Sequence, residues 1–263
     1  MEEINLLKKA VKKAGRVALN YYHSKNIIHE DGYTPLTKAD FASEKVLISE
    51  LKKTPYKILS EHQDNKERLK ENKIWIIDPL DGTKDFIQKT GEFSIMAALT
   101  QNNKPIIGAI YQPVTKKLYY AQKDKGAFLK QGRNKPIKLS VSNNTDFTDM
   151  SLLVSRNHLL PGEIKLCENL KIGKKIPYGS AGLKAALICE QKADIYLNSS
   201  DQTGEWDIGA AEIIFKEAGG KITDMLGHDL KYNKKKPINK QGFVLSHKLV
   251  HKKIISELKK INE

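Results

Sequence analysis

The chain has 263 residues, 40% of them hydrophobic, and shows neither low-complexity segments nor a repeat of fixed period. These features indicate a globular protein of one large domain or two lobes, and they exclude solenoids and disordered chains. The net charge of +14 comes from 45 basic residues that are mostly lysines spread along the chain, without any nucleic-acid-binding motif. We interpret them as a solvated, lysine-rich surface and expect no dedicated nucleic-acid partner.

The chain lacks the marks of a secreted or membrane-spanning protein. Its first residues carry acids and lysines, unlike a signal peptide. Its longest apolar stretches, such as 95–99 and 185–189, are far shorter than the roughly 20 residues that a spanning helix needs. Cys167 and Cys189 do not make a disulfide framework. We therefore expect a cytoplasmic protein, monomeric or homodimeric, and leave open whether its lysines hold it to an anionic membrane.

In the first half, apolar residues at helical spacing predict a long amphipathic helix over 3–22. A second helix is predicted to begin near Thr37, where Asp40 completes a capping-box pattern. Alternating and β-branched runs then predict successive strands at 56–60, 74–77, 93–100, 105–111, 118–121 and 126–129. This half is expected to be a helix pair over a largely antiparallel meander.

The polar region 130–150 indicates a connection between two lobes. Beyond it, strands at 151–155, 175–178, 193–198 and near Lys221 and Phe243 alternate with helices at 163–170, 182–190, 207–218 and the C-terminus. Such alternation is typical of an α/β arrangement. We predict an N-terminal α+β lobe over 1–140, a C-terminal α/β lobe over 141–263, and a ligand cleft between them.

The segment 74–83 reads I-W-I-I-D-P-L-D-G-T and is the most informative in the chain. Its apolar run predicts an interior strand that ends at Asp78, with Asp81 three residues later. Pro79 stiffens the exit and leaves the Leu80 carbonyl free, while Asp81-Gly82-Thr83 suits a turn into a helix N-terminus. Two carboxylates and a carbonyl suggest a site for hard cations beside an anion, but a structural turn explains the same residues equally well.

Three further carboxylates stand at the ends of apolar segments or the starts of helices, namely Asp40, Glu61 and Asp207. If they gather with Asp78 and Asp81, their mutual repulsion requires cations. Taken one at a time, Glu61 is also explained as a loop residue, and Asp40 and Asp207 as helix caps.

Together these segments resemble the lithium-sensitive, magnesium-dependent phosphatases related to inositol monophosphatase. The signature of that family pairs W-x-x-D-P-[LI]-D-G-T with a later W-D and an A-G-G, which here are Trp75 to Thr83, Trp206-Asp207 and Ala218 to Gly220. Two matching signatures in the right order favour metal chemistry over the turn and cap interpretations. The resemblance implies the layered αβαβα sandwich of the sugar phosphatases.

Within that family the chain looks most like the 3'(2'),5'-bisphosphate nucleotidases of the CysQ type. The segments that carry this likeness are 81–87, 90–93, 155–158, 179–184 and 203–207. One departure is His62, which stands where many relatives have a second glutamate.

The resemblance implies roles for individual residues. The implied ligands of two or three Mg²⁺ ions are Glu61, Asp78, the Leu80 carbonyl, Asp81 and Asp207. Thr83 would orient the attacking water, with Asp40 and Glu61 as proton-accepting partners, and the N–H groups of Gly82 and Thr83 would hold the scissile phosphate. The rest of the substrate would contact Lys84, Arg156, His158, Ser180 and Lys184, although His158 and Lys184 also fit ordinary surface positions.

The implied reaction is hydrolysis of adenosine 3',5'-bisphosphate to AMP and phosphate, a step connected with sulfur metabolism, with 3'-phosphoadenylyl sulfate as a second substrate. Inositol monophosphate and fructose 1,6-bisphosphate are the nearest alternatives, because one metal core serves all three. A basic nucleic-acid-binding protein on a non-catalytic phosphatase fold is an alternative of another class. It would require the loss of an acidic ligand, and none is lost.

Overall fold

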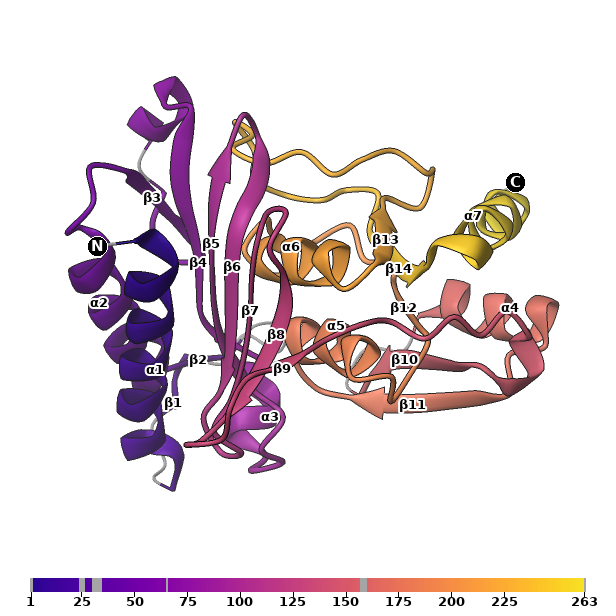
Figure 1. Ribbon diagram of the computed structural model, residues 1–263, viewed down its shortest axis with the longest axis horizontal. Coiled ribbons are helices and arrows are strands. Elements are labelled where there is room, and N and C mark those ends of the chain that lie inside the picture. Colours follow the sequence, from indigo (N-terminus) through magenta and orange to yellow (C-terminus); the bar gives the residue numbers. More distant parts are fainter. Residues whose placement is uncertain (1, 24–26, 30–34, 65, 157–159, 263) are drawn as a thin grey trace.

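The computed structural model describes residues 2–23, 27–29, 35–64, 66–156 and 160–262. Two sheets dominate it, one of seven strands and one of five (Figure 1). The seven-stranded sheet comprises β3 (Lys57–Ser60), β4 (Lys73–Asp81), β5 (Ser94–Gln101), β6 (Lys104–Gln112), β7 (Lys117–Gln122), β8 (Gly126–Gln131) and β9 (Ile137–Lys138), in that order. Only β3 and β4 pair in parallel, so the predicted antiparallel meander is confirmed.

Two helices cover one face of this sheet, α1 (Glu3–Tyr22) and α2 (Lys38–Leu51) (Figure 1). The capping box at the start of α2 is confirmed, because Thr37 and Asp40 make both of its reciprocal hydrogen bonds. Apolar side chains of both helices, such as Leu7 and Leu47, pack with Trp75 and Ile77 of β4 in one buried cluster. Between the helices, β1 (Ile27–His29) and β2 (Leu36–Thr37) form a short antiparallel pair that the sequence did not predict.

Strand β4 differs from the prediction that it stops at Ile77. It continues through Pro79 to Asp81, with a register shift against β5 between Asp78 and Asp81. Proline cannot donate to a ladder and is tolerated at such irregularities, which is why the strand passes through it. Asp78 and Asp81 therefore both lie within the strand, which leads directly into α3 (Thr83–Ile87).

The five-stranded sheet has the order β11-β10-β12-β14-β13. Its strands are β10 (Ser151–Ser155), β11 (Lys174–Tyr178), β12 (Ile195–Asn198), β13 (Gly220–Thr223) and β14 (Phe243–His247). The sheet is mixed, because β10 runs parallel to β11 and β12 while β14 runs antiparallel to its neighbours.

Helices α5 (Ala181–Cys189) and α6 (Gly209–Glu217) lie between the two sheets (Figure 1). Their side chains share a buried cluster with both sheets, for example Ile188 with Ile110 and Tyr196. Helices α4 (Pro161–Leu170) and α7 (Lys248–Asn262) pack on the outer face of the second sheet through a separate cluster. The order of layers is helix, sheet, helix, sheet, helix, which confirms the predicted αβαβα sandwich.

The region 130–150, predicted as a polar connection, contributes more structure than expected. It includes the end of β8, the edge strand β9 and a short 3-10 helix at Phe147–Asp149. The predicted division into lobes at residue 140 stays a prediction. Cys167 and Cys189 are both buried and unbonded. No helix in the described part of the chain is long and apolar enough to cross a membrane.

Candidate active site

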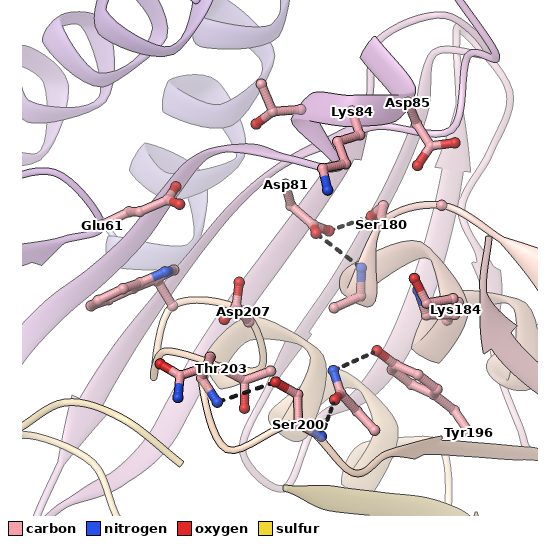
Figure 2. Close-up of a pocket in the computed structure, with 18 of the residues that line it drawn as sticks. Glu61, Asp81, Lys84, Asp85, Ser180, Lys184, Tyr196, Ser200, Thr203 and Asp207 are labelled. Atoms are coloured by element: carbon pink, nitrogen blue, oxygen red, sulfur yellow. Dashed lines mark hydrogen bonds between the residues drawn. The ribbon is translucent and has the colours of Figure 1, made fainter. Parts of the chain in front are cut away.

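A cavity of about 600 Å³ opens between the two sheets, and most of the predicted site residues line it (Figure 2). One side comes from the end of β4 and the start of α3, and the other from the start of α5, from β12 and from the loop that leads to Asp207. The predicted residues in its wall are Asp40, Glu61, Asp81, Gly82, Thr83, Lys84, Ser180, Lys184 and Asp207. The cavity thus joins segments that lie more than a hundred residues apart in the chain.

Asp81 is the residue that connects the two sides of this cavity. Its carboxylate accepts hydrogen bonds from the backbone nitrogen of Ala181 at 2.9 Å and from the hydroxyl of Ser180 (Figure 2). The backbone nitrogen of Gly182 donates to the same carboxylate at 2.9 Å. Ser94 on β5 donates a further hydrogen bond at 3.0 Å. The first N–H groups of a helix have no partner within the helix and attract negative charge. The N-terminus of α5 is therefore fixed on a carboxylate of the first sheet.

Asp78, Glu61 and Asp207 form the rest of the acidic group. Burial, and then the charge of Glu61, raise the pKa of Asp78 well above its usual range. Burial, and then the charge of Asp207, do the same to the pKa of Glu61. Burial and the charge of Asp81 raise the pKa of Asp207 to about 7. Carboxylates whose negative charges repel one another in this way are suited to bind a cation.

The donor set of this group fits a hard divalent cation, because every candidate ligand is a carboxylate or carbonyl oxygen. Hydrogen bonds occupy some of these oxygens, since Gly204 donates its N–H to Asp207 at 2.5 Å and Leu80 donates its N–H to Asp78 at 3.0 Å. Within the described residues, no three acidic, His or Cys side chains lie close enough together to enclose a metal ion as they stand. Metal binding would thus require small reorientations of these carboxylates.

Thr83 and Asp40 meet at the edge of the acidic group. The Thr83 hydroxyl lies 3.0 Å from the Leu80 carbonyl and 3.3 Å from one carboxylate oxygen of Asp40. The other oxygen of Asp40 accepts from the backbone nitrogen and the hydroxyl of Thr37, at 2.8 and 2.6 Å. Asp40 therefore caps α2 with one oxygen and presents the other to Thr83. Burial raises the pKa of this carboxyl despite those hydrogen bonds.

Gly82 makes the turn from β4 into α3 and has φ +90°. A Cβ at this position would lie 2.9 Å from the Glu92 carbonyl oxygen, so space as well as conformation requires glycine. The predicted turn into a helix N-terminus is confirmed at this point. Lys84, one residue into the helix, lines the same cavity (Figure 2).

Lys184 lies in the floor of the cavity, and its alternative interpretation as a surface lysine is wrong. Only 4% of it is exposed, and its ammonium donates to the Tyr178 carbonyl at 3.2 Å. The same ammonium lies 4.9 Å from the centre of the Tyr196 ring. Burial lowers the pKa of Lys184, against the opposing charges of Asp81 and Asp85. A buried cation thus lies on the opposite side of Asp81 from Glu61 (Figure 2).

Arg156 is predicted to bind substrate, but the structure pairs it with protein carboxylates. One of its terminal nitrogens lies 2.7 Å from both oxygens of Glu92, and its Nε lies 3.4 Å from Asp85. It is not among the described residues that line the cavity. The predicted substrate residue His158 lies outside the described residues.

Several residues of the cavity were missed as site residues by sequence reasoning. The side-chain atoms that are buried without a hydrogen-bond partner in the described chain are His62 Nε2 and Thr203 Oγ1, and both residues line this cavity. Thr203 is the first residue of the segment 203–207, which carries part of the likeness to the nucleotidases, so the sequence held a usable signal for it. Glu163 also lines the cavity, and burial raises its pKa to about 7. No sequence pattern marked Glu163, because only the fold brings α4 to the cavity.

Known proteins are similar to this chain in both sequence and fold. The model of the inositol monophosphatase family matches residues 1–263. The 3'(2'),5'-bisphosphate nucleotidases CysQ of Aggregatibacter actinomycetemcomitans and Haemophilus influenzae are each 32% identical, over 237 and 244 residues. Each alignment covers 86% of this chain, and 85% and 86% of those proteins.

Solved structures agree with these relatives. CysQ from Bacteroides thetaiotaomicron is 31% identical with a TM-score of 0.81, covering 94% of this chain and 97% of that one. An inositol monophosphatase of Thermotoga maritima shares the fold, with a TM-score of 0.83 at 23% identity, covering 100% of this chain and 98% of that one. The chain belongs to the inositol monophosphatase family.

Proposed function

We propose that this protein is a magnesium-dependent phosphomonoesterase that removes the 3'-phosphate of adenosine 3',5'-bisphosphate, giving AMP and phosphate. One observation carries the proposal: Glu61, Asp81 and Asp207 line a single cavity with the buried cation Lys184, and Glu61 and Lys184 lie on opposite sides of Asp81 (Figure 2). That polarity suits a substrate with one phosphate at a metal site and further negative charge beyond it. The name of the CysQ relatives supplies the nucleotide as the substrate class.

The residues that would hold Mg²⁺ are Glu61, Asp78, the Leu80 carbonyl, Asp81 and Asp207. Bound Mg²⁺ would lower the pKa of a water molecule and stabilise negative charge on the leaving oxygen. Burial, and then mutual repulsion, raise the pKa values of Glu61, Asp78 and Asp207. These shifts support the assignment, because a bound cation would stabilise the charged form of each carboxylate.

Thr83 and Asp40 would position the attacking water and take up its proton. The Thr83 hydroxyl has one hydrogen, and two acceptors lie within reach, the Asp40 carboxylate and the Leu80 carbonyl. When it donates to either of them, its oxygen can accept a hydrogen bond from water and so aim the water at phosphorus. Burial raises the pKa of Asp40, which makes its carboxylate a better proton acceptor than an exposed aspartate. Glu61 is the second proton-accepting partner.

The N–H groups of Gly82 and Thr83 would hold the scissile phosphate at the turn into α3. Lys84, Ser180 and Lys184 would contact the remainder of the substrate, and Thr203 would add a hydrogen bond from a hydroxyl that is buried without a partner in the described chain. Arg156 would act on the substrate only if the substrate's charge replaced that of Glu92.

The test compares phosphate release from adenosine 3',5'-bisphosphate, inositol 1-phosphate and fructose 1,6-bisphosphate, with Mg²⁺, after chelation, and with added Li⁺. We expect the nucleotide to have the highest kcat/KM, with activity lost after chelation and reduced by Li⁺. A preference for either sugar phosphate would refute the substrate. Wild-type activity in a folded Asp207→Asn variant would refute the metal assignment.

Several finer points stay predictions. They are hydrolysis of 3'-phosphoadenylyl sulfate, a place in sulfur metabolism, the binding of two or three Mg²⁺ ions, sensitivity to lithium, a cytoplasmic location, and a monomeric or homodimeric state. Each can be measured on the purified protein or in the cell, independently of the site residues.

A further inference from the structure

A second hollow lies away from the acidic cavity, between helix α1 and the part of the first sheet formed by β6, β7 and β8. Its volume is about 340 Å³, and its wall includes Lys12, Arg16, Lys116 and Lys130. None of the described residues that line it is acidic. We call these four residues the basic groove. In the described chain, none of the four makes an ion pair with a carboxylate.

Close packing between α1 and the chain at the end of β6 shapes the groove, and a tyrosine lines it. Gly15 of α1 lets the chain after β6 lie directly on the helix, because a Cβ there would come within 2.6 Å of the Tyr111 ring and 2.9 Å of Pro113. The turn at Lys116 is tied to the next hairpin by a hydrogen bond from Gly132 N to Lys116 O at 3.1 Å. The Tyr111 hydroxyl has no hydrogen-bond partner in the described chain that would occupy it, and Tyr111 lines the groove.

Helix α1 carries its cations in an arrangement that weakens the helix. Lys8, Lys12 and Arg16 follow one another at intervals of four residues, which places like charges side by side on one face. Lys130 on β8 adds to the repulsion, so that burial and the neighbouring cations lower the pKa of both Lys8 and Lys12. Glu2 is the acid that opposes this charge, and it acts on Lys8. Such an unfavourable arrangement of like charges is expected at a functional site, where a ligand can compensate the repulsion.

We propose that the basic groove is a second binding site, for a soluble small molecule that carries two or more adjacent phosphate groups. Four cations and a tyrosine from α1, β6, the β6–β7 turn and β8 line one hollow, which matches the several negative charges and acceptor oxygens of an oligophosphate. A membrane or a nucleic-acid backbone presents an extended row of charges and suits a flat or linear array of cations better than cations that line one hollow. The site does not depend on the proposed enzymatic reaction.

The test measures binding of inorganic tripolyphosphate by calorimetry, in a buffer with EDTA so that no divalent cation bridges the ligand to the acidic cavity. We expect saturable binding by the wild-type protein that weakens with salt. Replacing two cations, as in Lys12→Gln with Lys130→Gln, should weaken binding at least about tenfold, because each lost contact is a charged hydrogen bond. Tyr111→Phe should weaken it by a smaller, several-fold factor.

The matched control is Lys123→Gln with Lys125→Gln, which removes the same charge from the exposed turn at the opposite end of the β7–β8 hairpin. It should bind tripolyphosphate like the wild type, and both double variants should keep the basal rate of phosphate release. The proposal is overturned if the wild type shows no saturable binding, or if the groove and control variants lose affinity equally. Binding that appears only with anionic vesicles or RNA also overturns it.

Discussion

The carboxylate of Asp81 lies 2.9 Å from the backbone nitrogen of Gly182, so helix α5 begins on an acid that the opposite sheet supplies. The same carboxylate also receives the N–H of Ala181 and the hydroxyls of Ser180 and Ser94. Asp81 is therefore a structural anchor as well as a member of the acidic group. This double role separates it from Asp207, which accepts one backbone hydrogen bond, from Gly204.

Asp81→Asn and Asp207→Asn are expected to differ in stability although both abolish activity. In buffer without divalent cations, Asp81→Asn should lower the free energy of unfolding by about 2 kcal/mol, because hydrogen bonds to a charged group are lost. Asp207→Asn should raise the melting temperature, since it removes charge from a buried group. Burial, and then the charge of Asp81, raise the pKa of Asp207 to about 7. Calorimetry of both variants tests this, and equal melting temperatures would contradict the anchoring role.

Thr203→Val is expected to weaken substrate binding without lowering the stability of the fold. Asn239 N donates to the Thr203 carbonyl at 2.7 Å, which fixes the backbone, while the hydroxyl is buried without a partner in the described residues. Valine keeps the shape and removes only that hydroxyl, so the melting temperature should not fall. If the hydroxyl binds substrate, KM should rise about tenfold, as a lost hydrogen bond predicts. Thr203→Ser is the control and should keep most of the affinity, and an unchanged KM in the valine variant would exclude the contact.

Lys184→Met is expected to impair substrate binding without unfolding the protein. Replacing a buried charge with an apolar side chain of similar length is often neutral or stabilising. The loss of the cation should nevertheless raise KM by at least about tenfold, because a charged hydrogen bond to the substrate disappears. Steady-state kinetics and thermal unfolding are measured together. A variant that unfolds at lower temperature with normal KM would show that Lys184 serves the fold alone.

The buried ring of His251 is expected to make the folded protein less stable at acidic pH. Its ring nitrogens lie 2.9 Å from the Thr223 hydroxyl and 2.8 Å from the Ser246 hydroxyl, and burial lowers its pKa from 6.5 to about 4. As pH falls from 6.5 towards 4, the unfolded chain takes up a proton that the folded chain does not. His251 should therefore cost stability over that range, up to about 3 kcal/mol.

Denaturant unfolding at several pH values tests this prediction with His251→Gln. The variant should lose less stability than the wild type between pH 6.5 and 4, since it lacks the titrating ring. His228→Gln, which removes a histidine whose side chain is 72% exposed, is the control and should follow the wild type. Parallel stability curves for the wild type and His251→Gln would refute the assignment.

The sequence by itself determined most of the helices and strands and the family. Apolar periodicity gave α1 its observed bounds at Glu3–Tyr22, and the capping pattern placed the start of α2 at Thr37. Local signals of this kind work because capping and amphipathicity depend on neighbouring residues. The continuation of β4 through Pro79 was not predicted, because pairing with β5 extends the strand beyond the point where the sequence alone ends it.

Only the tertiary structure decided which groups share the cavity and in what state. It buried Lys184 where helical spacing allowed a surface position, and it turned Arg156 towards Glu92. It also brought to the same cavity Glu163 and the Thr203 hydroxyl, which has no hydrogen-bond partner among the described residues. The physical reason is that burial and long-range pairing depend on how the two sheets pack on α5 and α6, and the residues that meet there are far apart in the chain.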